Sequence, residues 1–311
     1  MRSTPTCRRS LAPTALPWAV AAALWGLWVA CAPGHTVEPP SPAPAAVAAE
    51  PAPGTFIVRY LANEGFLVEA AGQRVLIDGL FGPGIAGYPV VPPETRTEIE
   101  QGTGDWGGVQ VALATHFHGD HFDAEAVRRF LTANPEATFV STPQALELLA
   151  DAGFDPERHP GRTRALLPAV GATESLRFGE IEIEVLNLHH GRRQPPVENL
   201  GFVVRFGGMS LLHLGDTEAK MEDFEPYLAQ LEGVDLAILP FWFLASEWRA
   251  EMVREQIKPR WVIAAHTPTT TAGSHFGRWG SYDNLIQVMR DAFPEAKIPR
   301  TTGDSYDLTA D

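Results

Sequence analysis

The stretch that decides the fold is Thr115-His116-Phe117-His118-Gly119-Asp120-His121, which directly follows the apolar run of residues 109–114. The run predicts a strand, so the histidines begin where that strand ends. His116 and His118 are two residues apart, and in an extended segment they project to the same side. Gly119 permits a sharp turn that returns Asp120 and His121 towards that side. Packing does not explain four potential ligands within six residues, and the pattern predicts a metal site.

The side chains of this motif restrict the metal. Imidazole and carboxylate groups suit Zn²⁺, Mn²⁺ or Fe. The chain has two cysteines, Cys7 and Cys31, and both lie in the N-terminal region rather than near the motif. A thiolate-based zinc site and a disulfide-rich scaffold are therefore excluded.

Strands and helices are expected on both sides of the motif. Apolar patterns predict strands over residues 56–61, 65–69, 74–78, 173–188, 201–212, 236–239 and 261–265. Helices are expected over residues 124–133, with Asp123 as N-cap, and over 143–152, 246–257 and 282–292. Residues 201–212 line up with 65–76 at a constant offset of 136, which indicates equivalent hairpins in two lobes or convergent turn chemistry. Hairpins followed by helices predict sheets with helices packed outside.

The motif His-x-His-x-Asp-His after a strand resembles the metallo-β-lactamase fold superfamily of metallo-hydrolases. Three further features of that family occur in order: a mid-chain histidine in Leu188-His189-His190-Gly191, an acid in Gly215-Asp216-Thr217, and His266 after the strand 261–265. The resemblance covers about residues 55–300. It implies an α/β (αββα) fold, a four-layer sandwich of two mixed sheets with helices outside.

The resemblance also assigns the ligands. One metal would be held by His116, His118 and the mid-chain histidine, and a second by Asp120, His121 and His266, with Asp216 bridging. We favour His190 over His189 because His190 directly precedes Gly191 at the strand's end. Two divalent ions are expected, Zn²⁺ first, with Mn²⁺ or Fe as alternatives.

For further polar residues near the predicted site the sequence allows more than one role. His275 is the rival of His266, which we favour because the end of a strand positions a ligand better than a loop. Asp78 would either orient a histidine ligand through its other N–H group or make a turn. His213, inside a strand, is expected to pack in the core or behind the ligands.

The ligand set predicts metal-dependent hydrolysis, in which a metal-activated water attacks the substrate. Asp120 would orient this water or move its proton. An ester, lactone or phosphodiester is the expected substrate, either a small molecule or lipid-like. The alternatives are a β-lactamase-like hydrolase and a non-catalytic metal-binding envelope protein. An apolar pocket wall is expected from the aromatic residues Phe241, Trp242, Phe243, Trp248, Phe276 and Trp279.

The charge balance disfavours nucleic acid as a partner. The chain has 24 Lys+Arg against 38 Asp+Glu, a formal net charge of −14, whereas nucleic-acid binders usually present a basic face.

The N-terminus predicts export. Residues 1–30 carry three arginines and then an apolar run too short for a confident membrane span, which is the layout of a signal peptide. Ala30-Cys31 resembles a lipoprotein cleavage site, so Cys31 would be lipidated and hold the protein at the cell envelope. An uncleaved anchor and an ordinary signal are the alternatives. The Pro/Ala-rich residues 31–54 would form a tether, followed by the hydrolase domain, residues 55–311.

Overall fold

The computed structural model describes residues 54–191, 196–218 and 220–310. The expected signal peptide, the lipidated Cys31 and all of the tether except Gly54 lie outside the described residues. Within the described part of the chain, none of the helices is both long enough and apolar enough to span a membrane.

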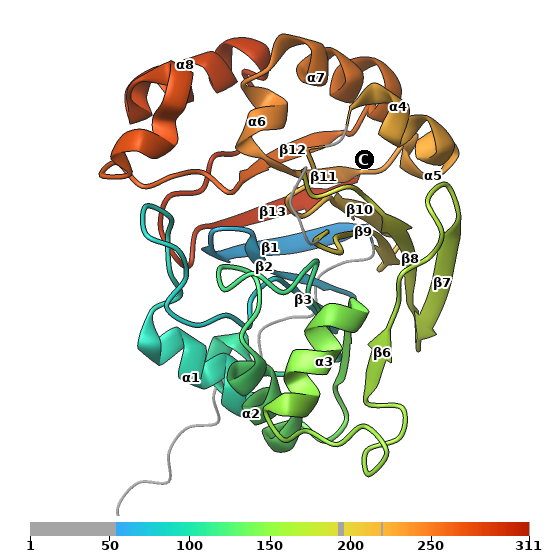
Figure 1. Ribbon diagram of the computed structural model, residues 1–311. Helices are drawn as coiled ribbons and strands as arrows, with labels where there is room; N and C mark the ends of the chain where they lie inside the picture. The colour runs from blue at the N-terminus through green and yellow to red at the C-terminus, as the bar shows by residue number, and fades with distance from the viewer. Residues whose placement is uncertain (1–53, 192–195, 219, 311) are drawn as a thin grey trace, which may run out of the picture. The chain divides into compact units, whose positions relative to one another are not determined.

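Two mixed sheets form the centre of the described structure (Figure 1). The first has seven strands in the order β13-β1-β2-β3-β4-β5-β6. Their bounds are β1 Thr55–Ala62, β2 Gly65–Ala70, β3 Gln73–Ile77, β4 Val111–Leu113, β5 Thr138–Ser141, β6 Thr163–Ala165 and β13 Ser305–Thr309. The second has six strands in the order β12-β11-β10-β9-β8-β7. Their bounds are β7 Thr173–Phe178, β8 Ile181–Asn187, β9 Leu200–Phe206, β10 Met209–His213, β11 Leu236–Pro240 and β12 Trp261–Ala265.

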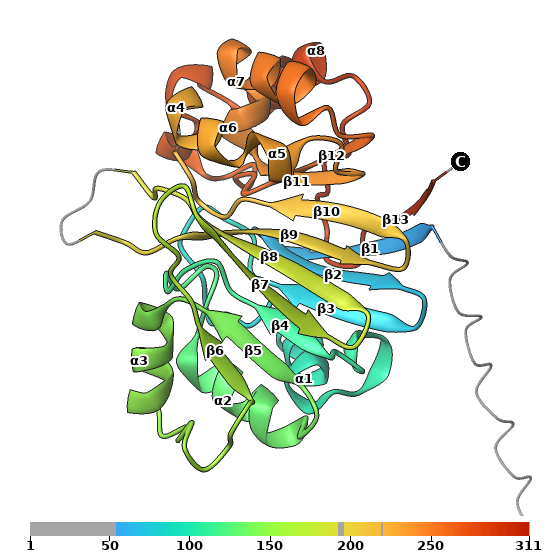
Figure 2. The same ribbon diagram turned by 90° about the vertical axis from the view of Figure 1, so that its right-hand side faces the viewer.

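Helices cover the outer faces of both sheets, and the turned view shows the four layers in succession (Figure 2). The first sheet is covered by α1 Pro93–Gln101, α2 Ala124–Ala133 and α3 Pro143–Asp151. The second is covered by α4 Met221–Phe224, α5 Leu228–Leu231, α6 Phe241–Leu244, α7 Glu247–Met252 and α8 Tyr282–Ala292. Short 3₁₀ turns occur at Gly104–Trp106, Glu225–Tyr227 and Gly273–Trp279. The expected αββα sandwich is confirmed.

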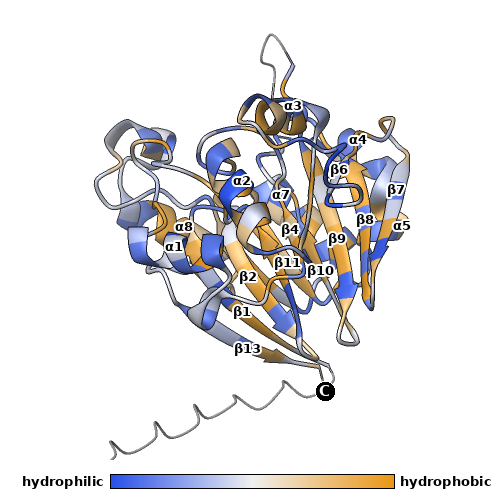
Figure 3. Ribbon diagram, turned by 90° about the horizontal axis from the view of Figure 1, so that it is seen from below, coloured by the Kyte–Doolittle hydropathy of each residue, from blue (hydrophilic) through white to orange (hydrophobic). Residues whose placement is uncertain are grey.

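The inner strands are largely apolar because both of their faces are covered, whereas the edge strands β6, β7 and β13 are polar and partly exposed. Along β9, Phe202 and Val204 enter the core between the two sheets, whereas Val203 packs on the helix side. In β1, Val58 likewise faces the second sheet and Leu61 faces the helices of the first layer. The hydropathy colouring shows these apolar strands between more polar helices (Figure 3).

The two hairpins expected from the offset of 136 residues occupy equivalent places in the two sheets. In the first, Phe66 pairs with Ile77 and Val68 with Val75. In the second, Phe202 pairs with His213 and Val204 with Leu211, which is the same register after adding 136. Each hairpin continues into a parallel strand, β4 or β11. The interpretation of the chain as two similar lobes is confirmed.

Local chemistry explains the helix boundaries. Asp123 caps α2 as expected, since its carboxylate accepts a hydrogen bond of 2.7 Å from the backbone N–H of Ala126. The helix expected over residues 246–257 is instead α7 followed by a π-helical turn, Val253–Ile257, which ends at Lys258 in the left-handed conformation. The boundary prediction was correct, but the sequence did not reveal the change of helix type.

Candidate metal centre

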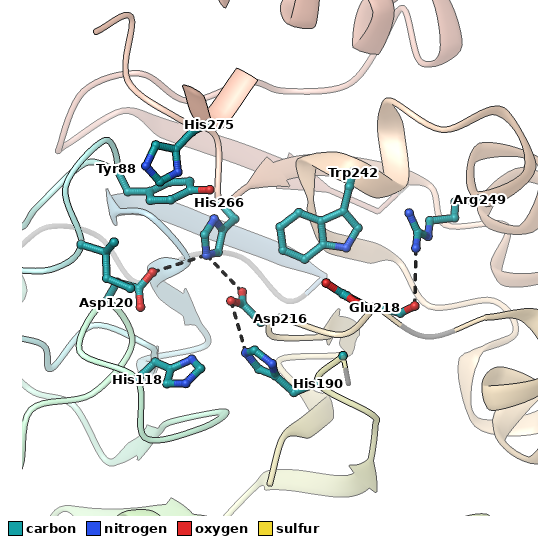
Figure 4. A pocket seen from close by; sticks show the side chains of 12 residues that line it. Tyr88, His118, Asp120, His190, Asp216, Glu218, Trp242, Arg249, His266 and His275 are labelled. Atoms are coloured by element: carbon teal, nitrogen blue, oxygen red, sulfur yellow. Dashed lines mark hydrogen bonds and ion pairs between the residues drawn. The ribbon is translucent and has the colours of Figure 1, made fainter. Parts of the chain in front are cut away.

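The predicted ligands lie where strands of both sheets end (Figure 4). The motif His116–His121 follows β4, and His190 follows β8. Asp216 follows β10, and His266 follows β12. Polar groups at the ends of neighbouring strands meet at one edge of a sheet, so this topology brings residues 150 positions apart into one cluster.

The first group of ligands is formed by His116, His118, His190 and Asp216, whose donor atoms all lie within 4.8 Å of one another. His116 Nε2 is 3.0 Å from His118 Nδ1. Oδ2 of Asp216 lies 3.5 Å from His190 Nε2 and 4.0 Å from His116 Nε2. Three imidazoles and one carboxylate oxygen thus converge on one point.

The second group is formed by Asp120, His121 and His266, again within 4.8 Å. The other oxygen of Asp216, Oδ1, lies 3.2 Å from His266 Nε2 and 3.3 Å from His121 Nε2. Oδ2 of Asp120 lies 3.4 Å from His266 Nε2. Asp216 therefore directs one oxygen to each group, the arrangement that a bridging carboxylate requires.

The structure places the two pairs of alternative ligands, His189 or His190 and His275 or His266, in different surroundings. His189 is exposed, and its carbonyl oxygen accepts hydrogen bonds from the Glu218 backbone and the Thr217 hydroxyl. His190, by contrast, faces Asp216. His275 lines the cavity but contacts Tyr88, with ring centroids 5.0 Å apart, and belongs to neither ligand group.

The donor set fits a metal. Buried polar atoms normally have a hydrogen-bond partner. Yet in the described residues six buried atoms of the predicted ligands have none: Asp120 Oδ1, His121 Nε2, His190 Nε2, Asp216 Oδ1 and both ring nitrogens of His266. All six are nitrogen or oxygen atoms of the kinds that coordinate a cation, and each belongs to a residue that the sequence predicted as a metal ligand.

Burial and nearby carboxylates shift the pKa values of the clustered histidines in opposite directions. Burial lowers the pKa of His116 well below its usual range and that of His118 to about 4, so both are neutral ligands. The carboxylates, Asp216 first, overcome burial and raise the pKa of His266 to about 10 and that of His121 well above its usual range. Protons and metal ions therefore compete at these two residues.

A second layer of hydrogen bonds fixes the tautomers of two ligands. Asp78 accepts at Oδ2 from Thr115 Oγ1 at 2.7 Å and from His121 Nδ1 at 2.8 Å. At Oδ1 it accepts from the Thr115 backbone N–H at 2.7 Å. The Thr115 hydroxyl thereby accepts from His116 Nδ1, 3.0 Å away. Both imidazoles then carry their proton on Nδ1, which leaves Nε2 free to bind a metal. Asp78 thus has the orienting role rather than only a turn role.

Asn63 is a residue that sequence reasoning missed. Its side-chain amide donates to the Asp120 side chain and backbone, both at 3.2 Å, and its backbone carbonyl accepts from the His266 backbone N–H at 3.1 Å. It therefore links two ligands of the second group. Asn63, Asp78 and His266 all have positive φ, between 44° and 52°, a strained backbone typical of functional sites.

Glu64 lies beneath the ligands and was also missed. It is fully buried, and neither carboxylate oxygen has a hydrogen-bond partner among the described residues. His213 is buried as expected and donates from Nε2 to the Glu64 backbone carbonyl at 3.1 Å, not to the side chain. Burial first, and the Asp216 charge second, raise the pKa of Glu64 well above its usual range.

Replacing Glu64 with methionine is expected to stabilise the fold by about 1–3 kcal/mol, because a buried carboxyl group without a hydrogen bond is removed, and its contact with His213 Nε2 is a long 3.8 Å. The folded protein holds the Glu64 proton above about pH 4.3, where the unfolded chain releases it. Stability therefore falls as pH rises through this window, and the advantage of the variant grows. Urea unfolding at pH 4.5 and 7.5 measures the difference in unfolding free energy between the variant and the wild type. A less stable variant at both pH values would show that Glu64 has a supporting role.

A cavity of about 720 Å³ opens above the ligands. Besides the ligands, its lining includes Ile85, Tyr88, Glu218, Trp242, Arg249 and His275. Tyr88 and Trp242 pack against His266, with ring centroids 4.3 Å and 5.3 Å from the imidazole. Burial is the largest of the causes that raise the pKa of the Tyr88 hydroxyl, so the phenol stays protonated.

The expected aromatic wall was largely wrong. Residues 241–244 form the helix α6, in which every side chain except that of Trp242 is buried. Phe241, Phe243 and Phe276 are buried in the core between the second sheet and its helices, and Trp279 packs against that core. Of this set only Trp242 lines the cavity. The cavity lining is therefore mixed, with charged and imidazole side chains beside Ile85, Tyr88 and Trp242.

The sequence and the fold define a protein class. Residues 73–277, more than half of the chain, match the family described as beta-lactamase superfamily domain. The chain belongs to this family and is a metal-dependent hydrolase of the metallo-β-lactamase superfamily.

Named relatives agree with this class. The chain is 27% identical over 253 residues to a protein of Symbiobacterium thermophilum named "UPF0173 metal-dependent hydrolase", covering 80% of this chain and 93% of that one. Among solved structures, a possible metal-dependent hydrolase of Veillonella parvula has a TM-score of 0.57 at 16% identity, covering 81% and 98% of the two chains. The metallo hydrolase Igni18 of Ignicoccus hospitalis has a TM-score of 0.54 at 17% identity, covering 83% and 100%. These structures share the fold.

Proposed function

We propose that the protein is a two-metal hydrolase, with Zn²⁺ as the first candidate, that acts on an ester, lactone or phosphodiester. The observation that carries this proposal is the placement of Asp216, whose two oxygens face the two histidine groups separately. His116, His118 and His190 would hold one ion. Asp120, His121 and His266 would hold the other.

The chain's own residues supply the remaining chemistry. Bound at these ligands, the ions would lower the pKa of a shared water and polarise the scissile group. Asp120 keeps Oδ1 without a hydrogen-bond partner among the described residues, so it can orient the attacking water and accept its proton. Tyr88, a neutral phenol in the cavity lining, can donate a hydrogen bond to the substrate oxygen that gains charge.

A substrate panel tests this proposal. The protein is assayed with Zn²⁺, Mn²⁺ and Fe²⁺ on a neutral ester, a lactone, a phosphodiester and a chromogenic cephalosporin. Turnover of one of the first three, abolished by a chelator and restored by metal, is the expected result. Turnover of the cephalosporin alone would favour a β-lactamase-like enzyme. Bound metal without turnover on any substrate would favour a non-catalytic envelope protein.

We further propose that the protein is exported and lipid-anchored through Cys31, with a small or lipid-like substrate met at the cell envelope. The support is the sequence of residues 1–31 alone. A Cys31→Ser protein is expected to move from the membrane fraction to the soluble fraction. Unchanged fractionation with membranes would contradict lipidation.

A further inference from the structure

Arg249, on α7, is a cation in the lining of the metal cavity. No other lysine or arginine lines that cavity among the described residues. Its neighbours in the lining include the carboxylates of Asp120, Asp216 and Glu218. In a chain with a formal charge of −14, an arginine at this place would ordinarily be expected to neutralise one of them.

Arg249 nevertheless makes no ion pair with any described residue. Asp120 and Asp216 are engaged with histidines. Glu218 directs its carboxylate towards Gly191, where Oε2 would lie 2.9 Å from an added Cβ. The guanidinium of Arg249 instead reaches the Glu218 backbone carbonyl at 3.4 Å, a long contact. Its buried Nε has no hydrogen-bond partner among the described residues.

Aromatic rings hold this guanidinium in place. Its central carbon lies 4.6 Å from the ring centroid of Trp248 and 5.7 Å from that of Phe243, so cation–π attraction orients the group without using its N–H donors. Half-burial lowers the pKa of Arg249 somewhat, but an arginine remains charged in proteins. The result is a half-buried guanidinium, oriented by two rings, whose N–H donors are largely unused.

Arg249 and the ligand groups stand apart within one cavity. In the view of Figure 4, Trp242 and Glu218 lie between Arg249 and the histidine cluster. Trp242 is itself held by a hydrogen bond of 2.9 Å from Nε1 to the Thr217 carbonyl. A substrate whose scissile bond lies at the ligands would therefore extend past Trp242 before it reaches Arg249.

We propose that Arg249 is a specificity-determining residue that binds an anionic carboxylate or phosphate group of the substrate, remote from the bond that is cleaved. This inference rests on the proposed hydrolase function and narrows its substrate class to anionic esters or lactones. The planar guanidinium binds either anion through two parallel hydrogen bonds.

The test compares two esters that differ by one charge, mono-p-nitrophenyl glutarate and its neutral methyl ester. Wild-type protein is expected to have a higher kcat/KM for the anionic ester than for the neutral one. Arg249→Met should reduce this preference about 10- to 100-fold, which is the range for a hydrogen bond to a charged group, by raising KM for the anionic ester. Arg249→Lys keeps the charge but lacks the planar pair of N–H donors, so its preference for the anionic ester should lie between those of the wild type and Arg249→Met. Arg278→Met is the matched control, because Arg278 also stacks on a tryptophan, at 4.8 Å, but does not line the cavity.

Equal loss on both esters, or an equal effect of the two methionine variants, would overturn the proposal. A binding measurement separates it from the hydrolase proposal. Quenching of tryptophan fluorescence by glutarate and, separately, by inorganic phosphate reports binding without turnover, and distinguishes the two anions. If the wild type cleaves neither ester, ester hydrolysis is refuted. A weakening of anion binding by at least about tenfold in Arg249→Met alone would still support the Arg249 site, and no weakening would overturn it.

Discussion

Replacement of Asp216 by asparagine is expected to lower kcat/KM for hydrolysis by about a thousandfold or more. The variant keeps the shape of the side chain but removes its charge and one of its two acceptor oxygens. The ligand groups on either side lose the shared anion that offsets two metal charges, a loss of several kcal/mol, and each 1.4 kcal/mol or so is tenfold in rate. Steady-state kinetics on the best substrate of the panel measures the effect.

The control for Asp216 is the exposed Asp291, whose carboxylate pairs with Gln287 on α8. Asp291→Asn is expected to retain wild-type turnover. A loss below about tenfold for Asp216→Asn, with folding intact, would mean that this carboxylate is not shared between two ions.

Replacement of Asp78 by asparagine is expected to weaken metal binding about 10- to 100-fold, the range for residues that orient a ligand. Asp78 accepts from three donors, two of Thr115 and one of His121. An asparagine turns one of its two acceptor atoms into a donor. Because the Thr115 backbone N–H cannot turn away from the Oδ1 position, the amide nitrogen takes the Oδ2 position, where it opposes both the Thr115 hydroxyl and the His121 Nδ1–H. His121 would then move its proton to Nε2, the atom that binds the metal. Asp78 is a positioning residue.

The readout for Asp78 is a metal titration of activity. The variant should need a higher metal concentration but approach wild-type kcat at saturation, whereas Asp216→Asn should not be rescued. Thr115→Ser, which keeps the hydroxyl, should behave as wild type. A reduced kcat at saturating metal with unchanged metal affinity would contradict the orienting role of Asp78.

The motif His116–His121 could be recognised from its own residues, because four potential ligands follow one predicted strand. The resemblance to a known family picked out His190, Asp216 and His266, and the structure brings these residues into one cluster with the motif. The choice of His190 over His189 also followed from its place beside Gly191. The hairpin repeat was visible because both copies keep their apolar spacing and turn glycines.

The sequence could not predict residues that act through contacts with distant segments. Asn63 and Glu64 lie in a turn between two strands, where polar residues are ordinary, and only the fold brings them under Asp120 and His213. In the sequence, Arg249 is indistinguishable from any other charged residue on a surface helix. The aromatic wall failed for a related reason: a four-residue helix has too short a pattern to show which of its side chains face the core.

The most direct test of the central claim is the metal content of the purified protein, measured for the wild type and Asp216→Ala. Two transition-metal ions per chain, falling to one or none in the variant, is the result that a shared carboxylate between two histidine groups predicts. At most one ion per chain, unaffected by the substitution, would contradict the two-metal site and the mechanism built on it.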